Sequence, residues 1–298
     1  MQRQLTELWY GPRGSGSLLQ PLAWAYGRAV RLRRAAYARG WLQVHALDKP
    51  VVVVGNLTVG GTGKTPLTLW LIEALAARGI RAGVVSRGYG RRSRSPGPQV
   101  VGPDSRWQEV GDEPWLMHRR AGCPVVVYGD RAAAAARLAV EPVDVLLCDD
   151  GLQHLALARD CEIAVIDGTR GLGNGRLLPA GPLREPPARL RGVDVIVVNG
   201  SSGEGPPLDP AIRGVAAPVL RMRLEMTEAR RVDGAGGARP LEQAFPPGGR
   251  VHAVAGIGHP ARFFGALEAH GLEVLRHAFA DHHAFMAGEL DFPDELPI

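Results

Sequence analysis

Runs of apolar residues, rich in valine and isoleucine, recur along the chain and alternate with stretches of helical composition. The first run, residues 51–54, is followed by a glycine-rich turn and by an expected helix from about Pro66 to Arg78. Strands that are apolar on both faces are typical of parallel sheets covered by helices on both sides. Further strands of this type are predicted at residues 80–86, 124–128, 143–148, 162–167 and 193–199, with a helix at 130–140. The pattern predicts an α/β fold with a doubly wound, mostly parallel sheet.

The regular alternation stops near residue 200 and resumes near residue 250. A loop rich in Gly, Pro and Ser covers residues 201–210, and an extended or hairpin connector is expected after it. A second unit then begins with a strand at 251–255 and a helix at 260–270. The expected parts are an N-terminal helical segment (1–40), a main domain (41–217), the connector (218–249) and a smaller C-terminal α/β domain (250–298).

The N-terminal segment combines a mildly apolar stretch, residues 18–26, with the basic stretch 31–34. A helix with Trp24 and Tyr26 at one end and arginines on its polar face is compatible with a position in a membrane interface. It is equally compatible with a terminal helix packed on its own domain. No segment approaches the roughly 18 uninterrupted apolar residues needed to span a bilayer, and the chain start lacks the order of a signal peptide. These features predict a protein that is not exported.

The composition narrows the choice of partners. A net charge of +5 and a pI near 9.5 favour an anionic partner, such as phospholipid, nucleic acid or a phosphorylated substrate. Lysine occurs only at Lys49 and Lys64, and asparagine only at Asn56, Asn174 and Asn199. Because arginine supplies almost all other basic positions, a lysine retained in a glycine-rich loop stands out. The three cysteines form no Cys-x-x-Cys pair and are expected to be reduced thiols.

The strongest local signal follows the first predicted strand, in the sequence Gly-Asn-Leu-Thr-Val-Gly-Gly-Thr-Gly-Lys-Thr-Pro of residues 55–66. A phosphate-binding loop (P-loop) requires a buried strand, glycines whose N–H groups surround a phosphate, and a helix whose N-terminus faces the anion. In such a loop Lys64 reaches the β- and γ-phosphates and the Thr65 hydroxyl binds Mg²⁺. The sequence therefore predicts a P-loop NTPase-like domain that uses ATP and Mg²⁺. The expected nucleotide contacts are Thr58, Val59, Gly60, Gly61, Thr62, Gly63, Lys64 and Thr65.

A pair of aspartates ends a later predicted strand, at Asp149 and Asp150. P-loop enzymes place a second metal anchor at the end of a buried strand. Paired aspartates at this place can also cap a turn, but the P-loop upstream favours Mg²⁺ binding near Thr65. Which of the two aspartates contacts the metal stays open.

Further short segments, in a fixed order, extend through most of the chain. They are residues 55–66, 86–90, 111–114, 149–154, 173–186, 256–258, 262–264 and 281–283. Together and in this order they resemble the tetraacyldisaccharide 4′-kinases of lipid A biosynthesis. The resemblance implies transfer of the γ-phosphoryl group of ATP to the 4′-hydroxyl of a tetraacylated glucosamine disaccharide 1-phosphate. It also implies work at the cytoplasmic face of the bacterial inner membrane, reached through the N-terminal segment.

The resemblance implies roles for particular residues. Asp112 is the base that accepts the proton of the sugar hydroxyl, His282 pairs with it, and Lys64 acts with them in catalysis. Without the resemblance, the residues around Asp112 favour a helix cap. Glu185 is expected near Mg²⁺, in a loop that closes over the nucleotide. The candidates for substrate contact are Tyr89, Arg131, Gln153, His154, Asn174 and Arg184.

Two other functions compete with the kinase. The loop Gly60–Thr65 resembles that of the membrane-associated partitioning ATPases, which act as switches, but Val59 stands where those proteins carry a signature lysine. A nucleic-acid-binding NTPase is suggested by the arginines of residues 87–94, which lack an aromatic platform. We therefore expect no nucleic acid and no obligate protein partner.

The C-terminal end departs from the family. Relatives continue past residues 281–283 to a further strand and a Thr-Glu-Lys-Asp-like segment, which is missing at residues 294–298. We therefore expect the C-terminal domain to be truncated.

Overall fold

The computed structural model describes residues 7–11, 16–91, 95–200, 209–232, 237–281, 283–294 and 296–298. The chain divides into two compact units, Met1–Arg223 and Leu224–Ile298. This division falls inside the range that the sequence predicts as a connector.

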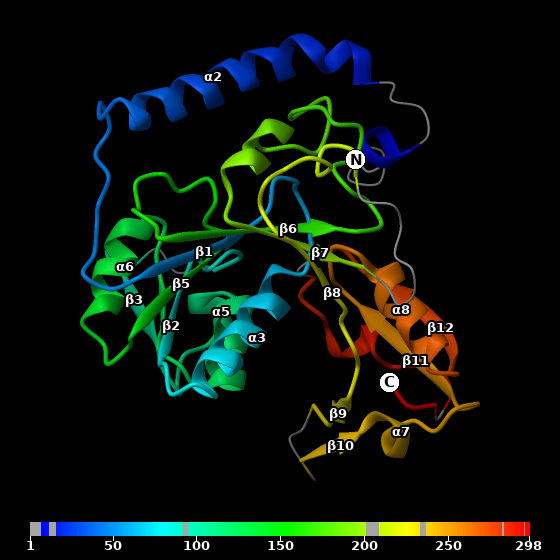
Figure 1. The fold of residues 1–298 in the computed structure, drawn as a ribbon. Coiled ribbons are helices and arrows are strands. Elements are labelled where there is room, and N and C mark those ends of the chain that lie inside the picture. The colour runs from blue at the N-terminus through cyan, green and yellow to red at the C-terminus, as the bar shows by residue number, and fades with distance from the viewer. Residues whose placement is uncertain are drawn as a thin grey trace. The chain divides into compact units, whose positions relative to one another are not determined.

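The first unit is built on an eight-stranded sheet with the order β3-β4-β2-β5-β1-β6-β7-β8 (Figure 1). Neighbouring strands are parallel except for the antiparallel pair β3 and β4. The strands are β1 (Val51–Gly55), β2 (Ala82–Ser86), β3 (Gln99–Val101), β4 (Val125–Val127), β5 (Val145–Asp149), β6 (Cys161–Asp167), β7 (Val195–Asn199) and β8 (Val219–Met222). The predicted α/β fold with a mostly parallel sheet is confirmed.

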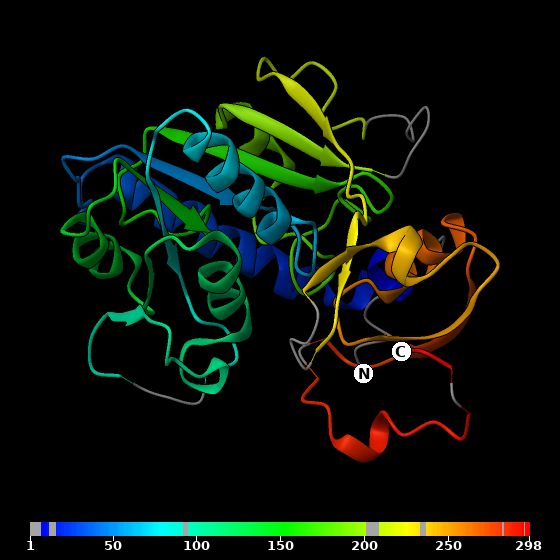
Figure 2. The same ribbon diagram turned by 90° about the horizontal axis from the view of Figure 1, so that it is seen from below.

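Alternate strand residues pack on opposite faces of this sheet, as the period of a strand requires. On one face Val84 packs in the same cluster as Ile72 of α3 (Lys64–Ala76) and Met117 of α5 (Asp112–Ala121). The ribbons of both helices can be followed in Figure 2. On the other face Val85 packs in the cluster of Leu138 from α6 (Arg131–Ala139). The sheet is therefore covered on both sides, which explains why its strands are continuously apolar.

The edges of the sheet differ most from the sequence prediction. The three-residue strand β3 and the short helix α4 (Trp107–Val110) were not predicted. The strand β8 lies in the range expected to form the connector, but it pairs with β7. Edge strands pair on one side only and are short here, so they leave little periodic signal in the sequence.

The helix α2 (Gln20–Ala38), preceded by the 3₁₀ turn η1 (Gly16–Leu19), lies over the loops between β6 and β7 (Figure 1). Ala23 and Gly27 are its buried residues, whereas Trp24 and Leu32 are exposed by 60% and 69%. Among the described residues, no helix combines the length and the apolar character that a membrane span requires.

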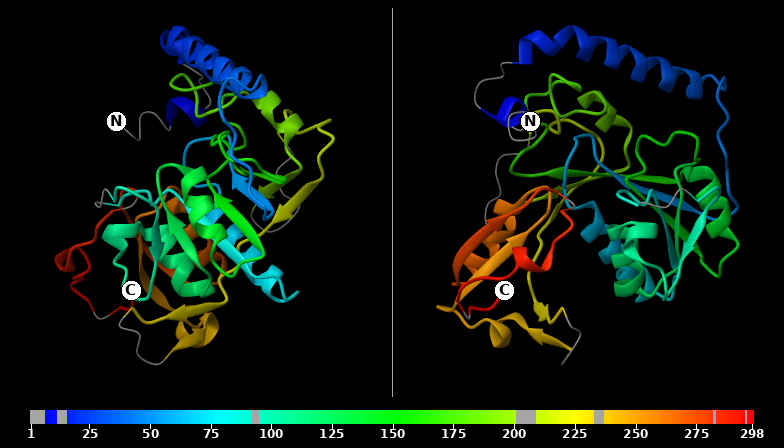
Figure 3. Two further views of the ribbon diagram at one scale, coloured as in Figure 1. Left: turned by 90° about the vertical axis from the view of Figure 1, so that its left-hand side faces the viewer. Right: turned by 180° about the vertical axis from the view of Figure 1, so that it is seen from behind.

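The second unit contains two small sheets. The strands β11 (Arg250–Ala255) and β12 (Glu273–Ala278) are parallel and lie beside α8 (Pro260–Ala269) (Figure 3). Phe264 and Leu267 of α8 belong to the buried cluster of this unit. The strands β9 (Glu228–Arg230) and β10 (Ala238–Pro240) form an antiparallel pair next to α7 (Leu241–Ala244), and η3 covers Ala287–Glu289. The predicted strand and helix of this unit are present, and β12 was not predicted.

Candidate active site

The predicted P-loop connects the central strand β1 to α3, which begins at Lys64. Gly63 has φ 96°, and a Cβ atom there would lie 2.3 Å from Nδ2 of Asn199. Both features require glycine. The Asn199 amide donates to the Thr62 carbonyl at 2.9 Å, so the end of β7 holds the loop in place.

Lys64 is held between an amide and a carboxylate. Its Nζ donates to Oδ1 of Asn56 at 3.3 Å and lies 3.6 Å from Oδ1 of Asp150. Asn56 is fully buried and also donates to the carbonyl of Gly60 at 3.3 Å. Gly60 and Gly61 are exposed. Buried Asn56 therefore holds the loop from the protein interior, while Gly60 and Gly61 face solvent.

Asp149 ends β5 and is only 2% exposed. Its Oδ1 accepts a hydrogen bond from Oγ1 of Thr68 at 3.4 Å. Burial, together with the carboxylates of Glu113 and Asp150, raises the pKa of Asp149 to about 7, against the opposing charge of Lys64. A buried carboxylate whose surroundings disfavour its charge fits the binding of a cation.

Asp150 has a different environment. Its φ is 49°, a left-handed conformation, and Nη1 of Arg184 donates to both carboxylate oxygens at 2.9 Å. Burial would raise the pKa of Asp150, but Lys64 and Arg184 together hold it below the ordinary value. Asp150 is thus the charged partner of two basic residues.

The N-terminus of α5 brings Asp112 to this region. The neighbouring Glu113 accepts a hydrogen bond from Oγ1 of Thr65 at 3.1 Å, so the first turns of α5 and α3 meet. Asp112 is the first residue of α5, and its Oδ1 accepts from the backbone N–H of Glu113. Glu113 was not singled out in the sequence analysis, because a glutamate in the first helical turn is also favoured by the helix dipole alone.

Tyr89 lies on a loop that touches the start of α5. Gly88 and Gly111 both have positive φ, and a Cβ atom on Gly111 would lie 2.9 Å from the Gly88 Cα and the Tyr89 carbonyl. Two glycines therefore permit this close approach. The Tyr89 side chain is 59% exposed, so it is open to a ligand.

Arg131 and His154 lie close enough to the aspartate pair for their charges to interact with it. Arg131 is 3% exposed, its buried Nε lacks a hydrogen-bond partner within the described ranges, and burial lowers its pKa. Burial, with the charges of Arg131 and Arg87, lowers the pKa of His154 to about 4, so His154 is neutral at pH 7. Arg131 is thus inside the protein, next to the acidic cluster.

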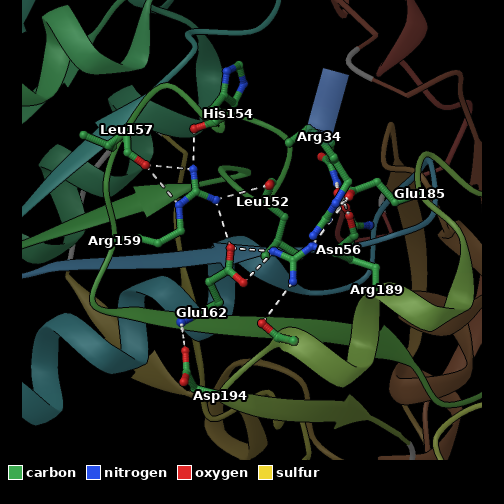
Figure 4. A network of polar contacts seen from close by, with 12 residues as sticks. Arg34, Asn56, Leu152, His154, Leu157, Arg159, Glu162, Glu185, Arg189 and Asp194 are labelled. Atoms are coloured by element: carbon green, nitrogen blue, oxygen red, sulfur yellow. Dashed lines mark hydrogen bonds and ion pairs between the residues drawn. The ribbon is translucent and has the colours of Figure 1, made fainter. Parts of the chain in front are cut away.

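Glu185 is surrounded by polar partners and is 3% exposed (Figure 4). Its carboxylate pairs with Nη1 of Arg34 at 2.5 Å and with Nε of Arg189 at 3.5 Å, and it accepts from Nε2 of Gln153 at 3.0 Å. Gln153 also donates to the Asn56 carbonyl at 3.1 Å. The predicted metal contact of Glu185 stays a prediction, and its present partners connect it to the P-loop through Gln153.

Among the predicted site residues that the structure describes, Asn174 does not lie in this cluster. Asn174 donates to the carbonyl of Ala180 at 2.9 Å and lines a cavity of about 330 Å³ together with Trp9, Tyr10 and Arg170. His282 lies outside the described residues, so its pairing with Asp112 stays a prediction.

The residues that the structure describes include no group of three or more Asp, Glu, His or Cys side chains placed to hold a metal ion. Mg²⁺ is usually bound through one or two protein ligands, with substrate phosphates and waters completing its shell. The Thr65 hydroxyl and the Asp149 carboxylate match that requirement, since Thr65 lies in the first turn of α3 and Asp149 accepts a hydrogen bond from Thr68 of the same helix.

Comparisons with known proteins agree with this geometry. The family model described as LpxK, tetraacyldisaccharide-1-P 4′-kinase, matches residues 16–296. A tetraacyldisaccharide 4′-kinase of Alkalilimnicola ehrlichii is 52% identical over 280 residues, which cover 94% of this chain and 80% of the relative. Another, of Pseudomonas paraeruginosa, is 47% identical over 296 residues, covering 99% and 85%.

A solved structure is also similar. The crystal structure of LpxK from Aquifex aeolicus in complex with ATP matches with a TM-score of 0.74 and 28% sequence identity. The match covers 95% of this chain and 86% of that chain.

Proposed function

The chain belongs to the tetraacyldisaccharide-1-P 4′-kinase family, and we propose that residues 58–65 and Asp112 carry the transfer of the ATP γ-phosphoryl group to the substrate's 4′-hydroxyl. The enzyme is a tetraacyldisaccharide 4′-kinase and acts in lipid A biosynthesis. This assignment decides against the partitioning-type ATPase switch.

The phosphates of ATP are proposed to lie on the P-loop. The exposed glycines Gly60 and Gly61, the αL conformation of Gly63 and the N-terminus of α3 support this position. Lys64 is close by, and its contacts with Asn56 and Asp150 leave it free to exchange a partner for a phosphate oxygen. The ATP complex of the similar LpxK structure supports the same assignment.

Mg²⁺ is proposed to bind between Thr65 and Asp149. When bound, the ion would supply positive charge that offsets the negative charge developing on the phosphates during transfer. Asp149 contributes a carboxylate that is costly to ionise without a cation, and Glu113 orients the Thr65 hydroxyl. The network of protein groups is therefore suited to one metal ion that arrives with the nucleotide.

Asp112 is proposed to accept the proton of the 4′-hydroxyl. Phosphoryl transfer depends mainly on position and charge, with one carboxylate that orients the attacking oxygen. The observation that carries this proposal is the Thr65–Glu113 hydrogen bond, which brings the start of α5 to the P-loop. Exposed Tyr89, on the adjoining loop, is proposed to contact the saccharide.

The substrate is proposed to be presented from the cytoplasmic face of the inner membrane through the outer face of α2. Leu22, Trp24 and Leu32 are exposed there by 59% to 69%, and Arg28 stacks over Trp24 at 4.3 Å. The helix contains no acidic residue. Exposed aromatic, aliphatic and arginine side chains together favour an anionic lipid interface.

The test is label transfer from γ-labelled ATP to detergent-dispersed tetraacyldisaccharide 1-phosphate in the presence of Mg²⁺. We expect Asp112→Ala to lower kcat by about two to three orders of magnitude, as removal of a catalytic base does. Asp144→Asn, which alters an exposed surface pair, is the control. Equal labelling by the parent and Asp112→Ala would remove Asp112 from its proposed role.

A further inference from the structure

The helix α2 has an inner face that differs from its exposed outer face. Ala23 and Gly27 are buried on the inner face, and Tyr26 and Arg34 are partly buried there. A Cβ atom on Gly27 would lie 2.6 Å from Cδ1 of Leu177, so the helix backbone lies directly against the loop between β6 and β7. The inner face is therefore a packing surface for that loop.

Two polar side chains of α2 reach consecutive residues of the same loop. The Tyr26 hydroxyl donates to the carbonyl of Arg184 at 3.0 Å. Arg34 donates through Nη1 to Oε2 of Glu185 at 2.5 Å, with side chains exposed by 39% and 4%. One end of this contact is accessible and the other is buried, so Arg34 is a main source of compensating charge for a carboxylate inside the protein.

From Glu185 a chain of hydrogen bonds continues to Asn56, in the segment that leads into the P-loop (Figure 4). Gln153 donates to both Glu185 and the backbone carbonyl of Asn56. The Asn56 side chain in turn accepts from Nζ of Lys64 and donates to the Gly60 carbonyl. A side chain of α2 is thus connected to the phosphate-binding lysine through three intermediates.

The backbone provides a second connection between the same loops. The Arg184 N–H donates to the Leu57 carbonyl at 2.7 Å, and the Val59 N–H donates to the Pro182 carbonyl at 2.9 Å. Movement of residues 182–185 would therefore shift residues 57–59, which lead into the P-loop.

The opposite side of Glu185 is fixed by a buried ion network. Arg189 pairs with Glu162 as well as with Glu185, and Arg159 pairs with Glu162 at 2.9 Å. Arg159 also donates to the carbonyl groups of Leu152 and His154, on either side of Gln153. This network therefore holds residues 152–154 and Glu185 on one side, while Arg34 holds Glu185 from α2.

We propose that Arg34 is a positioning residue for phosphoryl transfer, which acts through Glu185 and Gln153 to set the P-loop around Asn56 and Lys64. The inference rests on the proposed nucleotide site at residues 58–65. It makes α2 a helix with two tasks, since its outer face meets the lipid surface and its inner face orders the nucleotide site.

The test compares Arg34→Ala with Arg33→Ala in the full-length chain. Both variants remove one positive charge from the same helix, but Arg33 is exposed and its guanidinium lies over Tyr37 at 5.8 Å. For each variant we would measure kcat and the KM values for ATP and for detergent-dispersed tetraacyldisaccharide 1-phosphate. Co-sedimentation with anionic phospholipid vesicles reports the loss of lipid binding separately.

We expect Arg34→Ala to lower kcat/KM for ATP by roughly tenfold or more, because a small displacement of a positioned group has a large effect on transfer. The KM for the lipid in detergent stays near the parent value, whereas a general loss of folded protein changes neither KM. Arg33→Ala stays within about twofold of the parent for ATP. Vesicle binding is expected to fall more for Arg33→Ala, whose side chain is exposed, than for Arg34→Ala, whose side chain lies on the inner face.

Two further variants keep the test decisive if Arg34→Ala is poorly folded. Arg34→Lys retains the charge and is expected to recover part of kcat/KM. The Arg34→Ala/Glu185→Gln double variant is compared with its two single variants. If Arg34 acts through Glu185, the double variant loses less kcat/KM for ATP than the product of the two single losses. Equal ATP parameters for the Arg34 and Arg33 variants, or fully multiplicative losses, would overturn the inference. A parent that does not bind ATP would instead overturn the proposed nucleotide site.

Discussion

Two groups of buried carboxylates lie in the first unit, and they are neutralised to different extents. Glu162 lies between Arg159 and Arg189, and Glu185 lies between Arg34 and Arg189. Within the described part of the chain Asp149 forms no ion pair with an arginine, since its hydrogen bond comes from the Thr68 hydroxyl and the charges near it include the carboxylate of Glu113.

The difference separates a scaffold from a ligand site. A buried carboxylate that is paired with arginines has its charge neutralised without a ligand, and the ion pairs hold together the segments that carry it. A buried carboxylate that has its pKa raised by burial and by other acids gains most from a bound cation. On this argument we propose that the glutamates hold the loops and that Asp149 receives the metal ion, while a metal contact of Glu185 stays a prediction.

The largest expected effect comes from breaking the scaffold. Arg189→Leu removes a buried cation shared by Glu162 and Glu185, and we expect the free energy of unfolding to fall by about 3–5 kcal/mol. Urea unfolding followed by circular dichroism measures this change. Arg189→Lys, which keeps the charge but loses the bidentate geometry, is expected to lie between the two. An unchanged midpoint for Arg189→Leu would contradict a structural role for the network.

The ligand site is expected to respond in activity and not in stability. Asp149→Asn removes the charge that the metal ion requires, and we expect kcat to fall about 100-fold or more. Because the ionised form is disfavoured in the absence of a ligand, the same variant keeps or slightly raises the melting temperature. A variant that loses stability but retains kcat would reverse the assignment of the two groups.

A smaller effect is expected from pH. The pKa of His154 is about 4 in the folded protein, below the ordinary value of 6.5, through burial and the charges of Arg131, Arg87 and Arg33, with Asp150 opposing. The unfolded chain therefore binds a proton between pH 6.5 and 4 that the folded chain does not bind. Stability contributed by neutral His154 is complete above pH 6.5 and falls as the pH is lowered toward 4.

After a discount for partial exposure, this loss is on the order of 2 kcal/mol. The measurement is the free energy of unfolding of the parent and of His154→Asn at pH 7, 6, 5 and 4. The variant is expected to show a smaller decrease over this window. Parallel pH profiles would show that His154 titrates in the folded protein as it does in the unfolded chain.

The smallest effect is expected from an ion pair outside both groups. Arg137 and Glu141 lie one helical turn apart at 2.7 Å, with side chains exposed by 40% and 27%. We expect Arg137→Ala to change the free energy of unfolding by about 0.5 kcal/mol or less. A larger loss would mean that burial is not what distinguishes the Glu162 network from an ordinary surface pair.

The sequence was sufficient to predict the central strands and the P-loop, because both leave local patterns. Apolar runs predicted β1, β5 and β6 to within two residues, and the glycine spacing predicted the start of α3 at nearly the right place. The contacts between distant segments left no such pattern. Glu113 meets Thr65, and Arg34 meets Glu185, only because the fold brings together loops that are far apart in the chain.

The rarity of asparagine is a further signal in the sequence. Each of Asn56, Asn174 and Asn199 makes hydrogen bonds to the backbone of a loop. Two of them, Asn56 and Asn199, hold the P-loop itself. In a chain that seldom uses this residue, a retained amide indicates a place where both donor and acceptor are needed.

The most direct test of the contrast is the effect of Mg²⁺ on ATP affinity, measured by isothermal titration for the parent, Asp149→Asn and Glu162→Gln. The ratio of affinities with and without Mg²⁺ is expected to fall toward one in Asp149→Asn and to stay at the parent value in folded Glu162→Gln. An unchanged ratio in Asp149→Asn, or a loss confined to Glu162→Gln, would contradict the distinction between the two groups of carboxylates.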